Sequence, residues 1–153
     1  MKMVEAMSVS PSDPRSGNAS LPLSKLRGVP FAVRAALKAR RINSCAQLLA
    51  AASSGDKRSQ LASQARIDEG LLLTVVRRAD MARINGIGAV FGMMLEDLGI
   101  LEVPDLASQD AQELHGRLRQ YNQEERIARR SPTPEEVIDW ITQARGLPPL
   151  VTS

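Results

Sequence analysis

The sequence is poor in the residues that build metal sites, disulfides and aromatic clusters. Its 153 residues include one cysteine, one histidine, one tryptophan, one tyrosine and two phenylalanines. One cysteine excludes a disulfide within the chain, and the single histidine leaves no Cys/His set for a structural zinc ion. We therefore expect neither a metal nor a cofactor. The core must be made mainly of Leu, Ile, Val, Ala and Met, with a contribution from the four aromatic residues Phe31, Phe91, Tyr121 and Trp140.

Long apolar runs are also missing. No stretch approaches the roughly 20 apolar residues that cross a bilayer, and the N-terminus lacks the basic start and apolar core of a signal peptide. We therefore expect a protein of the cytoplasm. Runs of β-branched residues are scarce, whereas Ala, Leu, Arg and Glu are abundant. The length fits one domain, 43% of the residues are apolar, and the composition predicts an all-α fold.

One pattern occurs twice in the chain, 58 positions apart and without an insertion. Residues at matching positions agree in type over both copies. The matching pairs are Leu23 and Met81, Leu26 and Ile84, Gly28 and Gly86, Leu37 and Leu95, Ile42 and Ile100, Cys45 and Val103, and Leu48 and Leu106. The sequence therefore predicts an internal duplication.

The repeated pattern is that of a helix-hairpin-helix motif, which most often grips a nucleic-acid backbone. An apolar residue is followed by Gly-apolar-Gly, or its remnant, and then by a helix with one apolar face. In the second copy, Gly86 and Gly88 allow a sharp turn that leaves amide N–H groups for a phosphate at the start of the next helix. In the first copy Pro30 replaces the second glycine and removes one donor. The alternative is that each hairpin is only a tight turn between packed helices.

Charge is distributed unevenly between the copies. The net charge is +3, but residues 21–83 carry twelve Lys and Arg against four Asp and Glu, whereas residues 84–153 carry six against eleven. No Lys or Arg lies between Ile84 and Gly116, so a phosphate at the second hairpin should be repelled. Such asymmetry is typical of a basic face for a polyanion, or of halves that associate with a partner or another copy.

The basic face of the first copy is the strongest candidate site. Arg34, Lys38 and Arg41 lie four and three positions apart on the helix expected from Pro30, opposite its apolar side. We expect nucleic acid, DNA rather than RNA, to bind this face, with the Gly86 turn second. The candidate contact residues are Lys25, Arg27, Arg34, Lys38, Arg41, Gly86 and Gly88. The alternative is an ordinary solvated helix face.

The remaining polar candidates favour structural roles. We interpret Arg77 and Arg78 as cations near a helix C-terminus, although with Arg83 they could extend the basic surface. The arginines at positions 126, 129 and 130 lie close in sequence to Glu124 and Glu125, which favours a local salt-bridge network over an anion site. His115 has no partner at ligand spacing and is assigned to the surface. Core positions are predicted for Cys45, Tyr121, Trp140, Met81, Met93 and Met94.

The predicted organisation is a flexible arm over residues 1–20, then one domain over 21–150 with repeats at about 21–80 and 81–150. Thr133, Pro134 and Glu136 form a capping-box signal for a last helix that ends at Gly146. One further helix is predicted with Pro30 as its first residue. The others cover about 46–52, 57–64, 69–82, 89–98 and 110–120, with a short helix from Val103 and a further one at 123–129.

From about Leu21 to Pro149 the chain resembles bacterial domains of unknown function in the helix-hairpin-helix superfamily. The most specific segments are 83–88 (RINGIG), 98–100 (LGI), 103–106 (VPDL) and the closing region 129–144 with Trp140. The resemblance implies a compact domain of two tandem helix-hairpin-helix repeats, with SAM-domain-like or DNA-polymerase-type hairpin packing. It implies nucleic-acid association by analogy only and brings no catalytic residues. The chain departs from the pattern at Pro30.

Two functional hypotheses follow. The first is a non-enzymatic, sequence-tolerant nucleic-acid-binding protein that contacts phosphates through the basic first repeat. The second is a protein-interaction or scaffold module, including a subunit of a larger complex, in which the hairpins are purely structural. We expect no enzymatic activity, because helix-hairpin-helix glycosylases and lyases need an aspartate and often a lysine beside the hairpin. No lysine follows Gly88.

Overall fold

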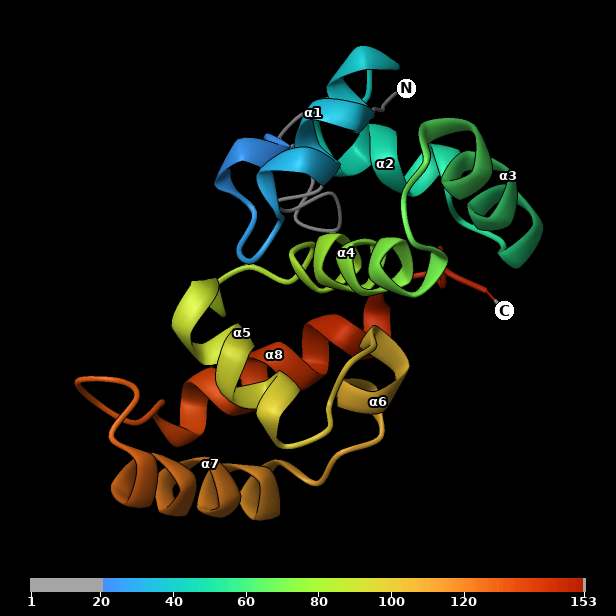
Figure 1. Cartoon of the computed structure of the whole chain (residues 1–153). Coiled ribbons are helices and arrows are strands. Elements are labelled where there is room, and N and C mark those ends of the chain that lie inside the picture. Colours follow the sequence, from blue (N-terminus) through green and yellow to red (C-terminus); the bar gives the residue numbers. More distant parts are fainter. Residues whose placement is uncertain (1–20, 153) are drawn as a thin grey trace, which may run out of the picture.

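The computed structural model describes residues 21–152, and the named elements in that part of the chain are all helices (Figure 1). This confirms the all-α prediction. The arm predicted at 1–20 lies outside the described residues. After a 3-10 turn at Leu23–Lys25, the helices are α1 (Phe31–Ala39), α2 (Cys45–Ala51), α3 (Gly55–Ala65), α4 (Glu69–Met81), α5 (Gly88–Asp97), α6 (Val103–Ala107), α7 (Ala111–Glu125) and α8 (Pro134–Gly146).

Two apolar clusters hold the helices together, one in each half of the chain. In the first half α4 packs on α2 and α3, and in the second α8 packs on α6 and α7. Cys45 and Met94 are fully buried and Trp140 is almost so, which confirms their predicted core positions. Helix α4 lies between the two groups of helices, so its end carries the chain directly from one half into the other (Figure 1).

The two halves share helix positions and backbone hydrogen bonds after a shift of 58 residues. Helix α1 ends at Ala39 and α5 at Asp97, while α2 begins at Cys45 and α6 at Val103. At the end of the first helix, Ile42 N donates to Leu37 O, and Ile100 N donates to Leu95 O, both at 2.9 Å. The correspondence extends through α3, whose shifted range lies within α7, and it ends there because the loop before α8 is longer than the loop before α4.

Local caps explain where the helices begin. The hydroxyl of Thr133 accepts from Glu136 N at 3.1 Å and the Glu136 carboxylate accepts from Thr133 N at 2.8 Å, so the predicted capping box is confirmed. The prediction for Pro30 was wrong by one residue. Its extended ψ of 146° makes it the N-cap, and Phe31 is the first helical residue.

The helix predicted at 123–129 is absent from the structure. Helix α7 instead runs without a break to Glu125 and ends at Arg126, whose φ of +53° is incompatible with a further helical turn. The buried Asn122 side chain then accepts from Ala128 N at 2.8 Å and donates to Ala128 O at 3.1 Å. These bonds fix the course of the loop that joins α7 to α8.

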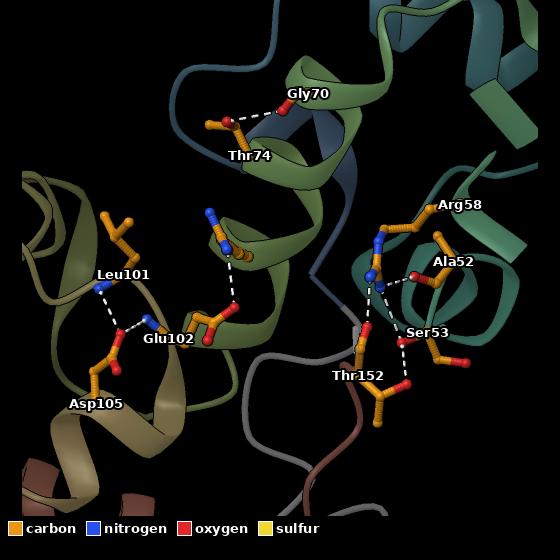
Figure 2. A network of polar contacts seen from close by, with 10 residues as sticks. Ala52, Ser53, Arg58, Gly70, Thr74, Leu101, Glu102, Asp105 and Thr152 are labelled. Carbon is orange, nitrogen blue, oxygen red and sulfur yellow. Dashed lines mark hydrogen bonds and ion pairs between the residues drawn. The ribbon is translucent and has the colours of Figure 1, made fainter. Parts of the chain in front are cut away.

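The C-terminal segment leaves α8 and returns to the first half of the chain. Arg58 of α3 is 5% exposed and donates to the carbonyls of Ala52, Ser53 and Thr152 (Figure 2). Thr152 N donates in turn to Ser53 O at 2.7 Å. The segment therefore ties the two halves together at a point far from the α4–α5 connection.

Candidate nucleic-acid interface

The predicted site residues lie in separate places. Arg34 and Lys38 line a groove of about 700 Å³ on the outer side of α1, and Arg41 follows the end of that helix. Lys25, Arg27 and Gly88 instead line a cleft between the two halves. Gly86 lies in the exposed turn before α5. The structure therefore brings together two subsets of the predicted residues and does not form one continuous site from all of them.

The groove on α1 contains an aromatic residue that the sequence analysis placed in the core. Phe31 is 75% exposed, and the Arg34 guanidinium carbon lies 5.6 Å from the centroid of its ring. The expectation was wrong because the buried side of α1 is set by Val33 and Leu37. Phe31 precedes Val33 by two residues, or about 200° around the helix. The sequence did contain a sign that Phe31 is exposed, because its spacing from Arg34 and Lys38 places all three residues on one face of the helix.

Apart from Arg27, the cations of the basic face have no acidic partner among the described residues. Among the described residues, no ion pair includes Lys25, Arg34, Lys38 or Arg41. Lys25, Lys38 and Arg41 are exposed, and Arg34 is half-buried. This surface therefore presents uncompensated positive charge to solvent, which attracts polyanions.

Other cations of the first half pair with acids of the second half. Glu96 accepts from Arg78 Nη2 at 2.9 Å and from Arg27 Nη2 at 3.2 Å, and Glu102 accepts from Arg77 Nε at 2.9 Å. The hydrogen bonds from Arg78 lower the pKa of the Glu96 carboxyl. Some of the opposite charges of the two halves therefore neutralise each other within the chain. The side chains of Arg77 and Arg78 reach across the halves, which the reading of them as helix-end cations did not anticipate.

Arg83 does not extend the basic surface. It is 3% exposed, pairs with Asp80 Oδ1 at 2.9 Å and donates to Pro148 O at 3.1 Å. Both of its observed contacts are structural. This leaves the basic surface of the first half to the residues around α1 and to the arginines that line the cleft.

The second hairpin is less isolated from cations than its sequence neighbourhood indicated. Gly86 and Gly88 have φ of +94° and +71°, and Gln143 of α8 holds the backbone of Asn85 on both sides, at 2.9 and 3.0 Å. The loop after α7 brings Arg129 and Arg130 to the start of α5, where they line a hollow of about 510 Å³ with Gly88. The prediction that phosphate is repelled at this turn did not take into account these two arginines, which lie more than 40 positions further along the chain.

These loop arginines also differ from the predicted local salt bridges. Arg130 pairs with Glu136 at 2.7 Å and lies 5.3 Å from the centroid of the Phe91 ring. No ion pair between described residues includes Arg126 or Arg129. Arg129 is therefore an exposed cation beside the second hairpin, and sequence reasoning did not select it.

The other predicted candidates have structural surroundings. The Tyr121 ring is half-buried and its hydroxyl donates to Asp97 at 2.7 Å, which raises the pKa of Tyr121 to about 12. His115 is half-buried on α7, beside the exposed Gly116. Over the described range, no three His, Cys, Asp or Glu side chains group as metal ligands would. No helix in that range is long and apolar enough to cross a membrane.

Comparison with known proteins gives one match. A family model described as "Domain of unknown function (DUF4332)" matches residues 28–147, from the first hairpin to the end of α8. No curated protein and no solved structure matches the chain. The resemblance to a family of domains of unknown function is thus confirmed. Because the match covers most of the sequence, the protein belongs to the family of domains of unknown function DUF4332.

Proposed function

We propose that this protein is a non-enzymatic, sequence-tolerant nucleic-acid-binding protein. Its contact surface is the outer side of α1, formed by Phe31, Arg34 and Lys38 and continued by Arg41, which we call the α1 surface. The observation that carries the proposal is an exposed aromatic ring beside cations that have no ion-pair partner among the described residues. The cations can contact the phosphates of a nucleic-acid strand, and the aromatic ring can contact its bases.

The chemistry of the α1 surface favours binding to the backbone without sequence readout. Lys and Arg that contact phosphates release counterions, so binding weakens as salt rises. Phe31 adds a flat apolar surface on which a base can stack, and stacking tolerates every base. An aromatic ring beside cations therefore favours single strands over a duplex, whose bases are already stacked.

The helix-hairpin-helix arrangement is part of this proposal. It is supported by the shared helix positions of the halves and by positive φ at Gly28, Gly86 and Gly88. The first hairpin is not itself a phosphate contact, because Pro30 has no N–H and the Gly28 carbonyl accepts from Arg78 Nη1 at 2.8 Å. We therefore assign the first contact to the helix face after the hairpin, and a weaker one to Gly88 with Arg129.

Fluorescence anisotropy of labelled single-stranded DNA, duplex DNA and RNA tests the proposal. We expect micromolar binding, with DNA bound more tightly than RNA. Three phosphate contacts weaken duplex binding about 40-fold between about 50 and about 200 mM salt, since each contributes a slope of about −0.9. Replacement of Arg34, Lys38 and Arg41 by Glu should abolish binding.

The matched control replaces Lys57, Arg66 and Arg119 by Glu. All three are exposed cations outside the α1 surface, and the net charge changes by the same amount. Retained binding in this variant, with loss in the α1 variant, assigns binding to the α1 surface. No binding by the wild-type protein at tens of micromolar, or equal loss in both variants, contradicts the proposal.

The second candidate function is a protein-interaction module. The observation that favours it is the use of hairpin backbone in internal contacts, with Gly28 held by Arg78 and Asn85 by Gln143. Under this hypothesis, sedimentation velocity should show self-association that rises with concentration and is relieved by salt. A monomer at all concentrations, together with salt-sensitive nucleic-acid binding, would favour the first function.

A further inference from the structure

The cleft between the two halves is separate from the α1 surface and has the features of a small-molecule site. Its walls are the turn around Lys25 and Arg27, the end of α4 from Arg77, and the first turns of α5 from Gly88. Its volume is about 270 Å³. This lies just below the usual range for ligand pockets, about 300 to 1,000 Å³, and such pockets often occur where two structural units meet.

Cations outnumber acids in the cleft. Lys25, Arg27, Arg77 and Arg78 line it, whereas Glu96 is the acidic residue among its lining side chains. Glu96 already binds Arg78 through Nε and Nη2 and Arg27 through Nη2. After the charge of Glu96 is taken into account, the lining still carries an excess of positive charge. Glu102, which pairs with Arg77 Nε, reduces this excess only in part.

Several donors of these arginines have no acceptor in the part of the chain that the structure describes. No hydrogen bond within the described part of the chain uses Nε or Nη1 of Arg27, or either terminal nitrogen of Arg77. Lys25 likewise donates to no described acceptor through Nζ. Guanidinium groups with paired free N–H donors match the geometry of phosphate and carboxylate oxygens.

The remainder of the lining is apolar. Leu26, Met81 and Ile87 contribute to it from the three walls, so the cleft offers a small apolar surface next to the cations. A bare inorganic anion would leave this surface in contact with water. An anion that carries a compact organic group would cover it and gain from the burial of apolar area.

We propose that the cleft binds a phosphate monoester on a compact organic group. A monoester carries between about −1.5 and −2 charge at neutral pH and three acceptor oxygens, which suits the excess of guanidinium donors better than a single carboxylate does. A phosphodiester within a strand has neighbours on both sides, and a cleft of this volume does not hold them. The phosphate can come from a free mononucleotide or from the 5′ end of a nucleic-acid strand.

Gly92 provides a way to block the cleft without removing a charge. A Cβ at this position would lie 3.7 Å from Ile87 Cγ2 and 4.0 Å from Arg27 Nε, which is ordinary contact distance. The fold should therefore tolerate Gly92→Ala, and a helix interior favours alanine over glycine. Both neighbours line the cleft, so the longer side chain of Gly92→Leu should occupy its space.

Isothermal titration calorimetry with AMP, adenosine and inorganic phosphate tests the proposal on the full chain. We expect AMP to bind at least about tenfold more tightly than either fragment, since a tenfold ratio corresponds to about 1.4 kcal/mol. Gly92→Leu and Arg77→Gln should each weaken AMP binding by about tenfold or more. Gly92→Ala and the α1 triple-Glu variant should bind as the wild type does. Thermal melts establish that each variant is folded.

Three results would overturn the inference: no heat with AMP at millimolar concentration, equal affinity for adenosine or inorganic phosphate, or unchanged AMP affinity in folded Gly92→Leu. The source of the phosphate is decided with 5′-phosphorylated and 5′-hydroxyl oligonucleotides of one sequence. Tighter binding of the phosphorylated strand, reversed by AMP, assigns the cleft to strand ends; equal binding assigns it to a free monoester. Because the α1 variant keeps the cleft, this proposal and the proposed function can fail independently.

Discussion

Glu96 of α5 and Arg78 of α4 form a two-point ion pair across the halves of the chain. Arg78 Nη2 lies 2.9 Å from Oε1 of Glu96 and Arg78 Nε lies 3.0 Å from Oε2. Arg27 adds a third donor to the same carboxylate at 3.2 Å. The geometry is bidentate, which makes this contact stronger and more directional than a single surface salt bridge. It fixes the end of α4 against α5 in the lining of the cleft.

We predict that Glu96→Gln lowers the free energy of unfolding by about 1 kcal/mol at neutral pH, a value that allows for partial solvent screening. The pKa of Glu96 is lowered in the folded protein. Its stabilisation is therefore present above the ordinary pKa of a glutamate, about 4.3, and is lost as the pH falls through the lower folded pKa. Urea unfolding at several pH values should show the difference between wild type and variant shrinking in acid. Glu113→Gln, an exposed acid outside the ion pairs of the described chain, is the control.

Alanine substitutions at Gly28 and Gly88 can distinguish the cost of a steric clash from the cost of backbone strain. Gly28 and Gly88 both have φ of +71°, so an alanine costs about 1 kcal/mol of backbone strain at either position. A Cβ at Gly28 would also lie 2.5 Å from Arg78 Nη1, whereas none of the surrounding atoms comes within 4 Å of one at Gly88. We predict that Gly28→Ala destabilises the protein by about 1 kcal/mol more than Gly88→Ala, because the Arg78 guanidinium must leave Glu96 or move. Equal losses in chemical denaturation would show that Arg78 relaxes freely.

Phe31 should distinguish single strands from duplexes. We predict that Phe31→Ala weakens single-stranded DNA binding about tenfold, within the range of about 1 to 3 kcal/mol for base stacking on an aromatic ring. Duplex binding should change less, and the melting temperature should hardly change because the ring is 75% exposed. Fluorescence anisotropy measures both affinities, and Phe31→Trp should keep them. If duplex and single-strand affinities fell equally, the ring would not act by stacking.

Helix positions were predictable because their signals are local. The capping box at Thr133 and the apolar spacing of α1 lie within a few residues of the structure they specify. The agreement of the two halves at Ile42 and Ile100 also follows from matched residues. The helix predicted at 123–129 failed because the buried side chain of Asn122, not propensity, determines the loop that follows α7.

The charged contacts were not predictable, since they join residues that are distant in the sequence. Arg27 and Glu96 are 69 positions apart, and the approach of Arg129 to the second hairpin depends on the length and direction of α7. The net charges of the two halves correctly predicted that the halves carry opposite charge, but they could not show which cations are neutralised by acids of the same chain. Only the fold distinguishes Arg78, which forms an ion pair, from Lys38, which forms none with the described residues.

Arg58 should be essential for anchoring the C-terminal segment. Its guanidinium is buried and donates to three carbonyls, two at the end of α2 and one at Thr152 (Figure 2). Arg58→Met keeps much of the apolar stem but removes the side-chain donor to the carbonyls of Ala52 and Thr152 and one of the donors to Ser53 O, so we predict a loss of about 2 to 3 kcal/mol in the free energy of unfolding. Hydrogen exchange at Thr152 N, which donates to Ser53 O, should become faster than the global loss explains. Arg66→Met, at the exposed end of α3, should change neither quantity. If exchange at Thr152 stayed slow in Arg58→Met, the apolar contact of Val151 with the first core would be sufficient to hold the segment.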